Sequence, residues 1–329
     1  MPGETELVER YFRLLGAVRA DVALGIGDDA AVLRVPAGQE LVQTTDALVA
    51  GAHFLADDDP ESIGYRLLSA NLSDLAAMGA QPAWALLSLT LPAVDEPWLA
   101  AFARGLGLLA REQAVALVGG NLARGPLQAS LALSGFVPPG LALRRDGARA
   151  GDELWVSGWP GEARAGLGLR HPQLRAAGLP GAAALDAPAR AALVARWQRP
   201  AARVALGIAL RGLASAAIDV SDGLWVDLGR LARASGCAAR LQLDALPVSR
   251  ALSAACGPDA WQELLAGGED YELCFAAAPG RAAEVRAAGE AAGVPLACIG
   301  RLAAGNGIRL LQGGAVMQFS APGYDHFDS

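Results

Sequence analysis

Short acidic motifs are spread along the chain, and their residue types suit the binding of a hard cation and of phosphate. The clearest is Ile-Asp-Val-Ser-Asp-Gly at residues 218–223, where an apolar strand is expected to pass into the start of a helix. Amides at a helix N-terminus attract phosphate, and carboxylates attract magnesium. Ser221 or Asp222 could instead simply cap the helix, but capping does not require Asp219. The motif therefore favours a metal–phosphate platform.

Two motifs in the first part of the chain offer further oxygen ligands. Residues 25–29 read Gly-Ile-Gly-Asp-Asp, in which Asp28 could hold a cation beside a flexible backbone, or the segment could be a turn with solvated acids. Thr44, Thr45 and Asp46 close an expected strand, where their oxygens suit magnesium or form a capping turn. His53 follows and could contact a phosphate or be a structural histidine.

Asp74 belongs to a segment, residues 60–78, that is expected to be a helix with Asp59 as its N-cap. At helical spacing, an otherwise apolar row that begins at Ile63 ends in Asp74. A carboxylate in such a row is unfavourable unless it is paired, binds a metal ion or reaches solvent at the helix edge. A functional role for Asp74 and a solvated one both remain open at this point.

Two glycine pairs and the last residues give weaker signals. Residues 118–121, Val-Gly-Gly-Asn, follow an expected strand and permit close approach of phosphate, with the Asn121 amide as a metal ligand. Residues 267–272, Gly-Gly-Glu-Asp-Tyr-Glu, predict either a helix stop or a pocket in which three acids and a tyrosine bind a cationic or hydrogen-bonding ligand. Tyr324 offers an aromatic ring, unless the tail is a frayed terminus.

The 27 basic residues are all arginine, and the sequence has no lysine. This excludes a Schiff-base enzyme, a Walker-type phosphate loop and the strand lysine of protein kinases. Phosphate chemistry would have to use metal ions, arginine and backbone amides. The net charge of −7 argues against nucleic acid or an anionic membrane as partner. No apolar run could span a bilayer and the polar, acidic N-terminus is not a signal peptide, so a cytoplasmic location is expected.

Strand-like and helical segments interleave along the 329 residues, which predicts an α/β or α+β protein of two domains. Val-Pro-Pro-Gly at residues 137–140 predicts the boundary, so that the domains are 1–138 and 139–329. The first is expected to hold helices at 6–15, 60–78 and 96–113 and strands at 22–24, 30–35, 40–45, 84–91, 116–118 and 128–136. The second is expected to hold helices within 162–213 and at 223–234 and 281–292, with strands at 154–157, 216–218, 239–243, 272–276 and 296–299.

In their order and spacing, the motifs resemble the thiamine-monophosphate kinase family, within the superfamily of aminoimidazole-ribonucleotide synthetase-like ATP enzymes. The resemblance covers nearly the whole chain and rests on residues 25–29, 45–46, 71–79, 219–223, 267–273 and 323–327. It implies an N-terminal ATP- and magnesium-binding domain that pairs in a homodimer, and a C-terminal α/β domain that completes the active site. It also implies direct in-line transfer of the γ-phosphoryl group of ATP to thiamine monophosphate, with several magnesium ions. No general base is needed, because the acceptor is already an ionised phosphate.

The resemblance also implies roles for individual residues. The implied metal ligands are Asp28, Thr44, Thr45, Asp46, Asp74, Asn121, Asp219 and Asp222. The implied ATP contacts are Gly120, Asn121, Arg145 and Ser221, and the implied contacts to thiamine phosphate are His53, Glu269 and Tyr324. One departure concerns residues 119–123, which read Gly-Gly-Asn-Leu-Ala where many relatives read Gly-Gly-Asp-Thr-Thr, so one metal site would lack a charge.

Other enzymes of the superfamily match less well. A selenophosphate synthetase would carry a reactive cysteine or selenocysteine in the N-terminal glycine-rich segment, whereas Cys237 is the first cysteine here. A hydrogenase-maturation relative would end in a modified cysteine, and an aminoimidazole-ribonucleotide synthetase would lack Gly-Gly-Glu-Asp-Tyr-Glu. A non-catalytic nucleotide- or thiamine-binding protein is an alternative of another class, against which the retention of the other acids argues.

Overall fold

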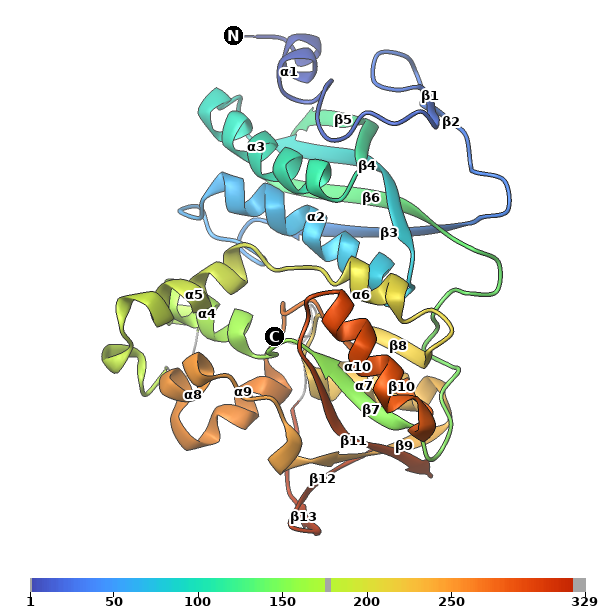
Figure 1. The fold of residues 1–329 in the computed structure, drawn as a ribbon. Helices are drawn as coiled ribbons and strands as arrows, with labels where there is room; N and C mark the ends of the chain where they lie inside the picture. The colour runs from blue at the N-terminus through green and yellow to red at the C-terminus, as the bar shows by residue number, and fades with distance from the viewer. Residues whose placement is uncertain (1, 175–178, 322–329) are drawn as a thin grey trace. The chain divides into compact units, whose positions relative to one another are not determined.

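Two compact units make up the chain in the computed structural model, which describes residues 2–174 and 179–321. One unit comprises residues 1–75 and 80–140, and the other comprises residues 76–79 and 141–329. Each combines one large sheet with several helices (Figure 1), which confirms the expected mixed α/β class. No helix in these two described stretches has both the length and the apolar character needed to cross a membrane.

The first unit is built on a four-stranded sheet with the order β3-β6-β4-β5. Its strands are β3 (Glu40–Val49), β4 (Gln81–Leu91), β5 (Ala116–Arg124) and β6 (Gln128–Val137). Strand β6 pairs antiparallel with both β3 and β4, and β5 pairs parallel with β4. The unit also contains α1 (Glu4–Tyr11), the short pair β1 (Val22–Leu24) and β2 (Val32–Leu33), and the long helices α2 (Pro60–Ala77) and α3 (Glu96–Glu112).

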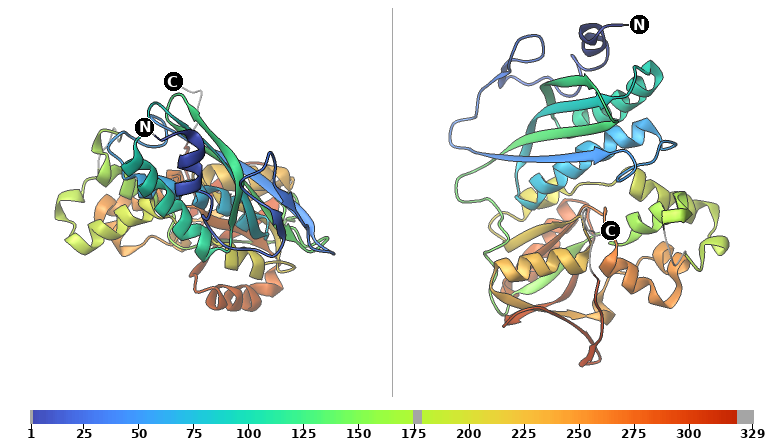
Figure 2. Two further views of the ribbon diagram at one scale, coloured as in Figure 1. Left: turned by 90° about the horizontal axis from the view of Figure 1, so that it is seen from above. Right: turned by 180° about the vertical axis from the view of Figure 1, so that it is seen from behind.

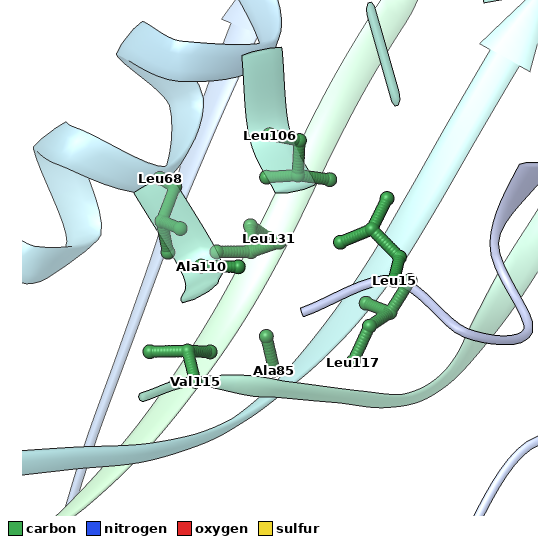
Figure 3. Close-up of a pocket in the computed structure, with 8 residues that line it drawn as sticks. All are labelled: Leu15, Leu68, Ala85, Leu106, Ala110, Val115, Leu117 and Leu131. Atoms are coloured by element: carbon green, nitrogen blue, oxygen red, sulfur yellow. The ribbon is translucent and has the colours of Figure 1, made fainter. Parts of the chain in front are cut away.

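Helices α2 and α3 cover one face of this sheet, because alternate residues of the strands are buried. On β4, Leu87 and Leu89 are buried, whereas the intervening Ser88 is exposed. A small apolar cavity lies between the buried face and the helices, lined by Leu68 of α2, Leu106 of α3 and six other apolar residues (Figure 3). The other face of the sheet stays exposed.

The second unit contains a seven-stranded sheet with the order β13-β12-β9-β11-β7-β10-β8, in which only β9 and β12 pair parallel among the described strands. Its strands are β7 (Glu153–Ser157), β8 (Ala214–Val220), β9 (Cys237–Gln242), β10 (Glu272–Ala277), β11 (Leu296–Ala304), β12 (Ile308–Gln312) and β13 (Ala315–Met317). The β12–β13 hairpin forms one edge of the sheet (Figures 1 and 2). The strand order also places β10 between β7 and β8.

Helices cover both faces of the second sheet. They are α4 (Glu162–Arg170), α5 (Ala187–Gln198), α6 (Val204–Ala209), α7 (Leu224–Ala234), α8 (Arg250–Cys256), α9 (Ala260–Ala266) and α10 (Ala282–Ala291). Leu228 of α7 and Leu264 of α9 belong to the same buried core as Ile218 of β8. On the other face, the guanidinium of Arg286 from α10 lies 5.0 Å above the centre of the Trp155 ring of β7.

Candidate active site

Asp74 and two residues of β3 form the clearest group in the first unit. Asp74 lies in the last turn of α2 and is partly exposed. Alternation along β3 turns Thr44 and Asp46 toward α2, on the same side as the buried Leu48. The Thr44 hydroxyl donates a hydrogen bond of 2.5 Å to a carboxylate oxygen of Asp74. The structure therefore brings Thr44 and Asp74 into direct contact, with Asp46 on the same face of the strand.

Two other predicted ligands of the first unit, Thr45 and Asp28, belong to another face and another loop. Thr45 is exposed and belongs to the opposite face of the sheet, because it alternates with Thr44 and Asp46. Asp28 is exposed in the loop between β1 and β2, where its carboxylate accepts a 2.8 Å hydrogen bond from the amide of Asp29.

The strand expected at residues 116–118 is longer than predicted, because it continues beyond Val118 through Gly120 and Asn121. Parallel pairing with β4 continues to Arg124, so both residues lie inside β5. Gly120 has φ +152°, and a Cβ there would stand 1.8 Å from the carbonyl oxygen of Leu87, so this position requires glycine. Asn121 pairs with Ser88 and is exposed. Because β3 and β5 are the two edges of the sheet, Asn121 is about 14 Å, or three strand spacings, from β3.

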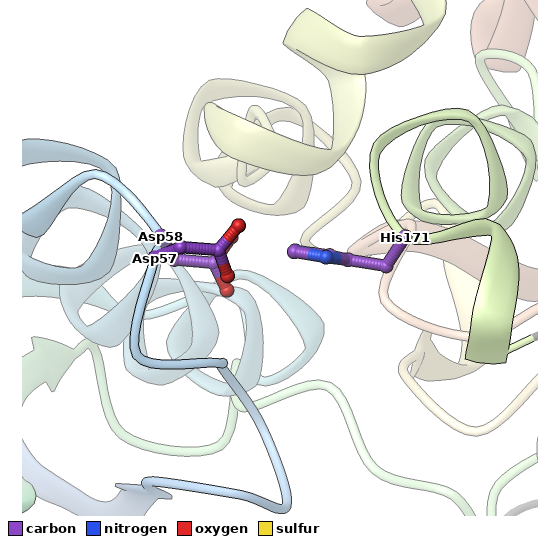
Figure 4. Close-up of side chains that lie close together, drawn as sticks. All are labelled: Asp57, Asp58 and His171. Atoms are coloured by element: carbon purple, nitrogen blue, oxygen red, sulfur yellow. The ribbon is translucent and has the colours of Figure 1, made fainter.

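His53 is held in one tautomer by the backbone. Its Nδ1 accepts a 3.1 Å hydrogen bond from the amide of Val49, so the ring proton of neutral His53 lies on Nε2. The carbonyl of His53 in turn accepts a 3.0 Å bond from the buried Arg66. Two acids, Asp57 and Asp58, lie side by side further along the same loop (Figure 4), and the Asp58 carboxylate accepts a 2.8 Å bond from the amide of Leu55.

In the second unit, Asp227 shapes the loop that carries Ser221 and Asp222. One oxygen of its buried carboxylate accepts 3.0 Å hydrogen bonds from the amides of both residues. Arg230 bridges Asp227 and Asp222 at 2.6 and 2.5 Å. Burial raises the pKa of Asp227 to about 6, against the lowering effect of the amides and of Arg230. Neither Ser221 nor Asp222 caps the helix, because α7 begins after Gly223 without a side-chain cap; that simpler interpretation of the motif is wrong.

The loop at residues 267–271 is bonded directly to the segment that carries Ser221. The amide of Glu269 donates to the carbonyl of Ser221 at 2.8 Å, and the amide of Tyr271 donates to the carbonyl of Val220 at 2.9 Å. Asp219, which is 4% exposed, pairs with Leu273 in the ladder between β8 and β10. Two motifs that are far apart in the sequence therefore form one surface of the second unit.

Glu272 is a structural residue at the first position of β10. It is fully buried, and Arg203 donates two hydrogen bonds to it at 2.6 and 2.5 Å. Arg196 adds a bond of 2.7 Å and Ser157 one of 2.5 Å. Burial acts to raise the pKa of Glu272, but the bonds and charges of the two arginines outweigh it and hold the pKa below its usual range. Gly158 has φ +59° and lies so close that its Cβ would be 2.0 Å from Glu272.

Asp270 is also fully buried, and it holds the start of α4. Its two carboxylate oxygens accept hydrogen bonds from the amides of Gly161 at 2.6 Å and Ala163 at 3.0 Å. Burial raises the pKa of Asp270 to about 8, and the two amides act in the opposite direction. Asp270 and Glu272 thus do not line a pocket, so the expectation of three ligand-binding acids is wrong for two of them.

Glu269 is the acid of this loop that remains partly exposed. Its carboxylate accepts a 2.7 Å hydrogen bond from the indole nitrogen of Trp197, which is 2% exposed. His171, at the end of α4 (Figure 4), lies edge-on to the Trp197 ring with the ring centres 5.5 Å apart. Glu269 therefore combines a fixed carboxylate with access to solvent.

Two further predicted residues do not join these groups. Arg145 is exposed before β7, and its carbonyl accepts a 2.7 Å bond from Ser235. Tyr324 lies outside the described residues. Asp227 and Trp197 are the residues that sequence reasoning missed. The available signal for Asp227 was an acid on the first turn of a helix directly after Ser-Asp-Gly, but no sequence pattern indicated Trp197.

The donor chemistry fits magnesium in both units. The candidate ligands are carboxylate, hydroxyl and amide oxygens, the types that magnesium prefers. In the first unit, the buried side-chain oxygen of Asn71, one turn before Asp74, has no hydrogen-bond partner among the described residues. Among those residues, neither Asp28 nor Asp74 is paired with an arginine. Their charge is therefore available to a cation.

Family models and known proteins match the chain over most of its length. Residues 27–137 match the model of the AIR synthase related protein, N-terminal domain, and residues 149–312 match that of its C-terminal domain. The chain is 46% identical to a thiamine-monophosphate kinase of Salmonella typhimurium, over 99% of this chain and 98% of that protein. The crystal structure of a thiamine-monophosphate kinase from Stenotrophomonas maltophilia is 45% identical, with a TM-score of 0.83 over 90% of this chain and 93% of that one. A structure of AaThiL complexed with AMPPCP and TMP is 32% identical, with a TM-score of 0.76 over 92% of each chain.

Proposed function

Because the chain belongs to the thiamine-monophosphate kinase family, we propose that it phosphorylates thiamine monophosphate by direct in-line transfer of the γ-phosphoryl group of ATP, assisted by magnesium. Thiamine diphosphate and ADP are the products. The observation that carries this proposal is the match to thiamine-monophosphate kinases over nearly the full length of both chains. The relative complexed with AMPPCP and TMP supports ATP and thiamine monophosphate as the two substrates.

The residues of the chain have separable roles in this proposal. Thr44, Asp46 and Asp74 would hold magnesium in the first unit, with Asp28 from its exposed loop. Asp219 and Asp222 would do so in the second unit. When bound, magnesium neutralises phosphate charge, the task that lysine performs in other kinases. Ser221 and Arg145 would contact ATP.

Thiamine monophosphate offers two groups for recognition, a phosphate and a cationic ring. His53 suits the phosphate, because its fixed tautomer makes Nε2 a hydrogen-bond donor. Glu269 suits the ring, because a partly exposed carboxylate attracts a cation. The acceptor phosphate is ionised at neutral pH, so these residues need only bind and align it, and no side chain has to remove a proton.

The sheet of the first unit supports a homodimer. Its face opposite α2 and α3 exposes Leu41 of β3 and Leu86 of β4, which are 44% and 48% exposed. Gly120 and Asn121 lie at the β5 edge, remote from Asp46 at the β3 edge of the same chain. A second copy paired through this face would cover the apolar side chains and bring its own Gly120 and Asn121 toward Thr45, the predicted metal ligand on this face of β3. The domain at 1–138 would thus bind ATP and magnesium and form the dimer, the domain at 139–329 would complete the site, and the enzyme would act in the cytoplasm.

An ATP-consumption assay with purified protein tests the reaction. Thiamine monophosphate, free thiamine and aminoimidazole precursors would be offered in parallel, each with and without magnesium. We expect turnover with thiamine monophosphate and magnesium only. Turnover with free thiamine only, or with none of the compounds, would contradict the proposal, and light scattering on the same sample would test the dimer.

A further inference from the structure

The loop that carries Glu269 has an uncommon backbone. Among the described non-glycine residues, three have positive φ, and two of them, Glu269 at 65° and Tyr271 at 52°, flank Asp270. Residues with side chains rarely adopt this left-handed conformation, and it persists where the surrounding structure enforces it. Such residues concentrate at ligand-binding sites, which makes the support around Glu269 informative.

Hydrogen bonds fix the backbone of this loop from two sides. The amides of Glu269 and Tyr271 donate to the carbonyls of Ser221 and Val220, at the end of β8. Between them, the buried carboxylate of Asp270 accepts bonds from two amides at the start of α4. The loop is therefore attached both to the segment carrying Ser221 and to α4.

The side chain of Glu269 is fixed by a third element, α5. Trp197 donates its indole hydrogen to the Glu269 carboxylate at 2.7 Å. The preceding residue, Arg196, is bonded to the buried Glu272 at 2.7 Å, which anchors this end of α5 to β10. Neighbouring residues of α5 thus hold the carboxylates of Glu269 and Glu272, and the donor to Glu269 is a neutral indole.

We propose that Trp197 is a positioning residue for substrate recognition, which holds the Glu269 carboxylate ready for the cationic ring of thiamine monophosphate. The inference rests on the proposed function. A carboxylate that is ordered before the substrate arrives loses little conformational freedom on binding, so its attraction for a cation is retained as affinity. Trp197 would therefore act on recognition of the thiamine ring and not on phosphoryl transfer.

The substitution Trp197→Phe removes the indole hydrogen and keeps an aromatic ring beside His171. We expect the KM for thiamine monophosphate to rise about tenfold, while kcat and the KM for ATP stay within about twofold of wild type. Trp84→Phe is the matched control, because the buried Trp84 also donates its indole hydrogen to a carboxylate, that of Asp21, at 3.1 Å. This control should lower thermal stability by a similar amount and leave both KM values unchanged.

A second variant keeps the inference testable if Trp197→Phe does not fold. Glu269→Gln retains an oxygen for Trp197 but loses the charge. Wild type should prefer thiamine monophosphate over an analogue with a neutral ring, and Glu269→Gln should lose most of that preference. An unchanged KM in Trp197→Phe, or full ring discrimination in Glu269→Gln, would overturn the inference alone. Failure of wild type to use thiamine monophosphate would overturn the proposed function with it.

Discussion

Asp270 and Glu272 of the second unit and Asp28 and Asp74 of the first are held in opposite ways. In the second unit, Asp270 and Glu272 are fully buried and are surrounded by amides or arginines. In the first unit, Asp28 and Asp74 are exposed or partly exposed, and their carboxylates meet only one amide and one hydroxyl within the described residues. Removing one member of a buried, compensated group destabilises the fold, whereas acids with an uncompensated charge remain able to bind a cation. Acidic motifs that look alike in sequence therefore serve two purposes.

The largest expected effect is a loss of stability in the variant Glu272→Ala, which tests the structural role of a buried acid. Its removal takes the buried carboxylate away from Arg203 and Arg196, of which Arg196 keeps Glu162 at 3.5 Å, so the free energy of unfolding should fall by about 3–5 kcal/mol. Urea denaturation measures this. Glu284→Ala is the control, because it breaks the exposed ion pair with Arg281 and should change stability little. Equal stability losses in the two variants would abolish the distinction between buried and exposed acids.

The substitution Asp74→Asn tests the other side of the comparison. The amide oxygen can still accept the Thr44 hydrogen bond, so the fold should survive, but the lost charge should lower kcat/KM by about 10²–10³-fold. Steady-state kinetics and thermal melting are measured together. Asp95→Asn, which replaces the N-cap of α3 by another good cap, should leave both unchanged. Near-normal activity in Asp74→Asn would remove Asp74 from the metal-binding group.

The raised pKa of Asp227 predicts that the stability of the second unit depends on pH. This pKa is about 6 in the folded chain and near 3.8 when unfolded, so unfolding releases a proton between these values. Asp227 therefore contributes to the free energy of unfolding below pH 3.8. This contribution, on the order of 3 kcal/mol, is lost as the pH rises through 6. Denaturation of wild type and Asp227→Asn from pH 4 to 7, in chelator, should show the wild type losing stability relative to the variant. Parallel pH profiles would contradict the prediction.

The smallest expected effect is a change in the magnesium requirement on substitution of Asn121, whose amide is exposed on the edge strand β5. Asn121→Asp adds a charge to that position, and we expect the magnesium concentration for half-maximal activity to fall, by about tenfold or less. A magnesium titration of turnover measures it. Gln128→Glu, which makes the same chemical change at an exposed end of β6, should have no such effect. An equal change in both variants would indicate general surface charge instead of a site at Asn121.

Sequence patterns predicted the elements more accurately than the partners of individual side chains. The helix expected at 60–78 is observed as Pro60–Ala77, and Asp59 accepts bonds from the amides of Glu61 and Ser62 at its start. Local periodicity and caps suffice for such an element. The burial of Asp270 and Glu272 could not be predicted, because it depends on Gly161 and Arg203, which tertiary structure brings from distant segments. The strand through Gly120 was missed for the same reason, since only pairing with β4 sustains it.

The position of β7 has a consequence for the order of folding during synthesis. Ser157, at the end of β7, bonds to Glu272, which lies 115 residues later in the chain. At roughly 5–20 residues per second, β10 leaves the ribosome about 6 to 23 s after β7. Until then the apolar strand has neither of its neighbours, since β11 follows β10. Nascent chains of this enzyme thus have a defined interval of exposure to chaperones, and a synonymous change that slows translation between β7 and β10 would lengthen it.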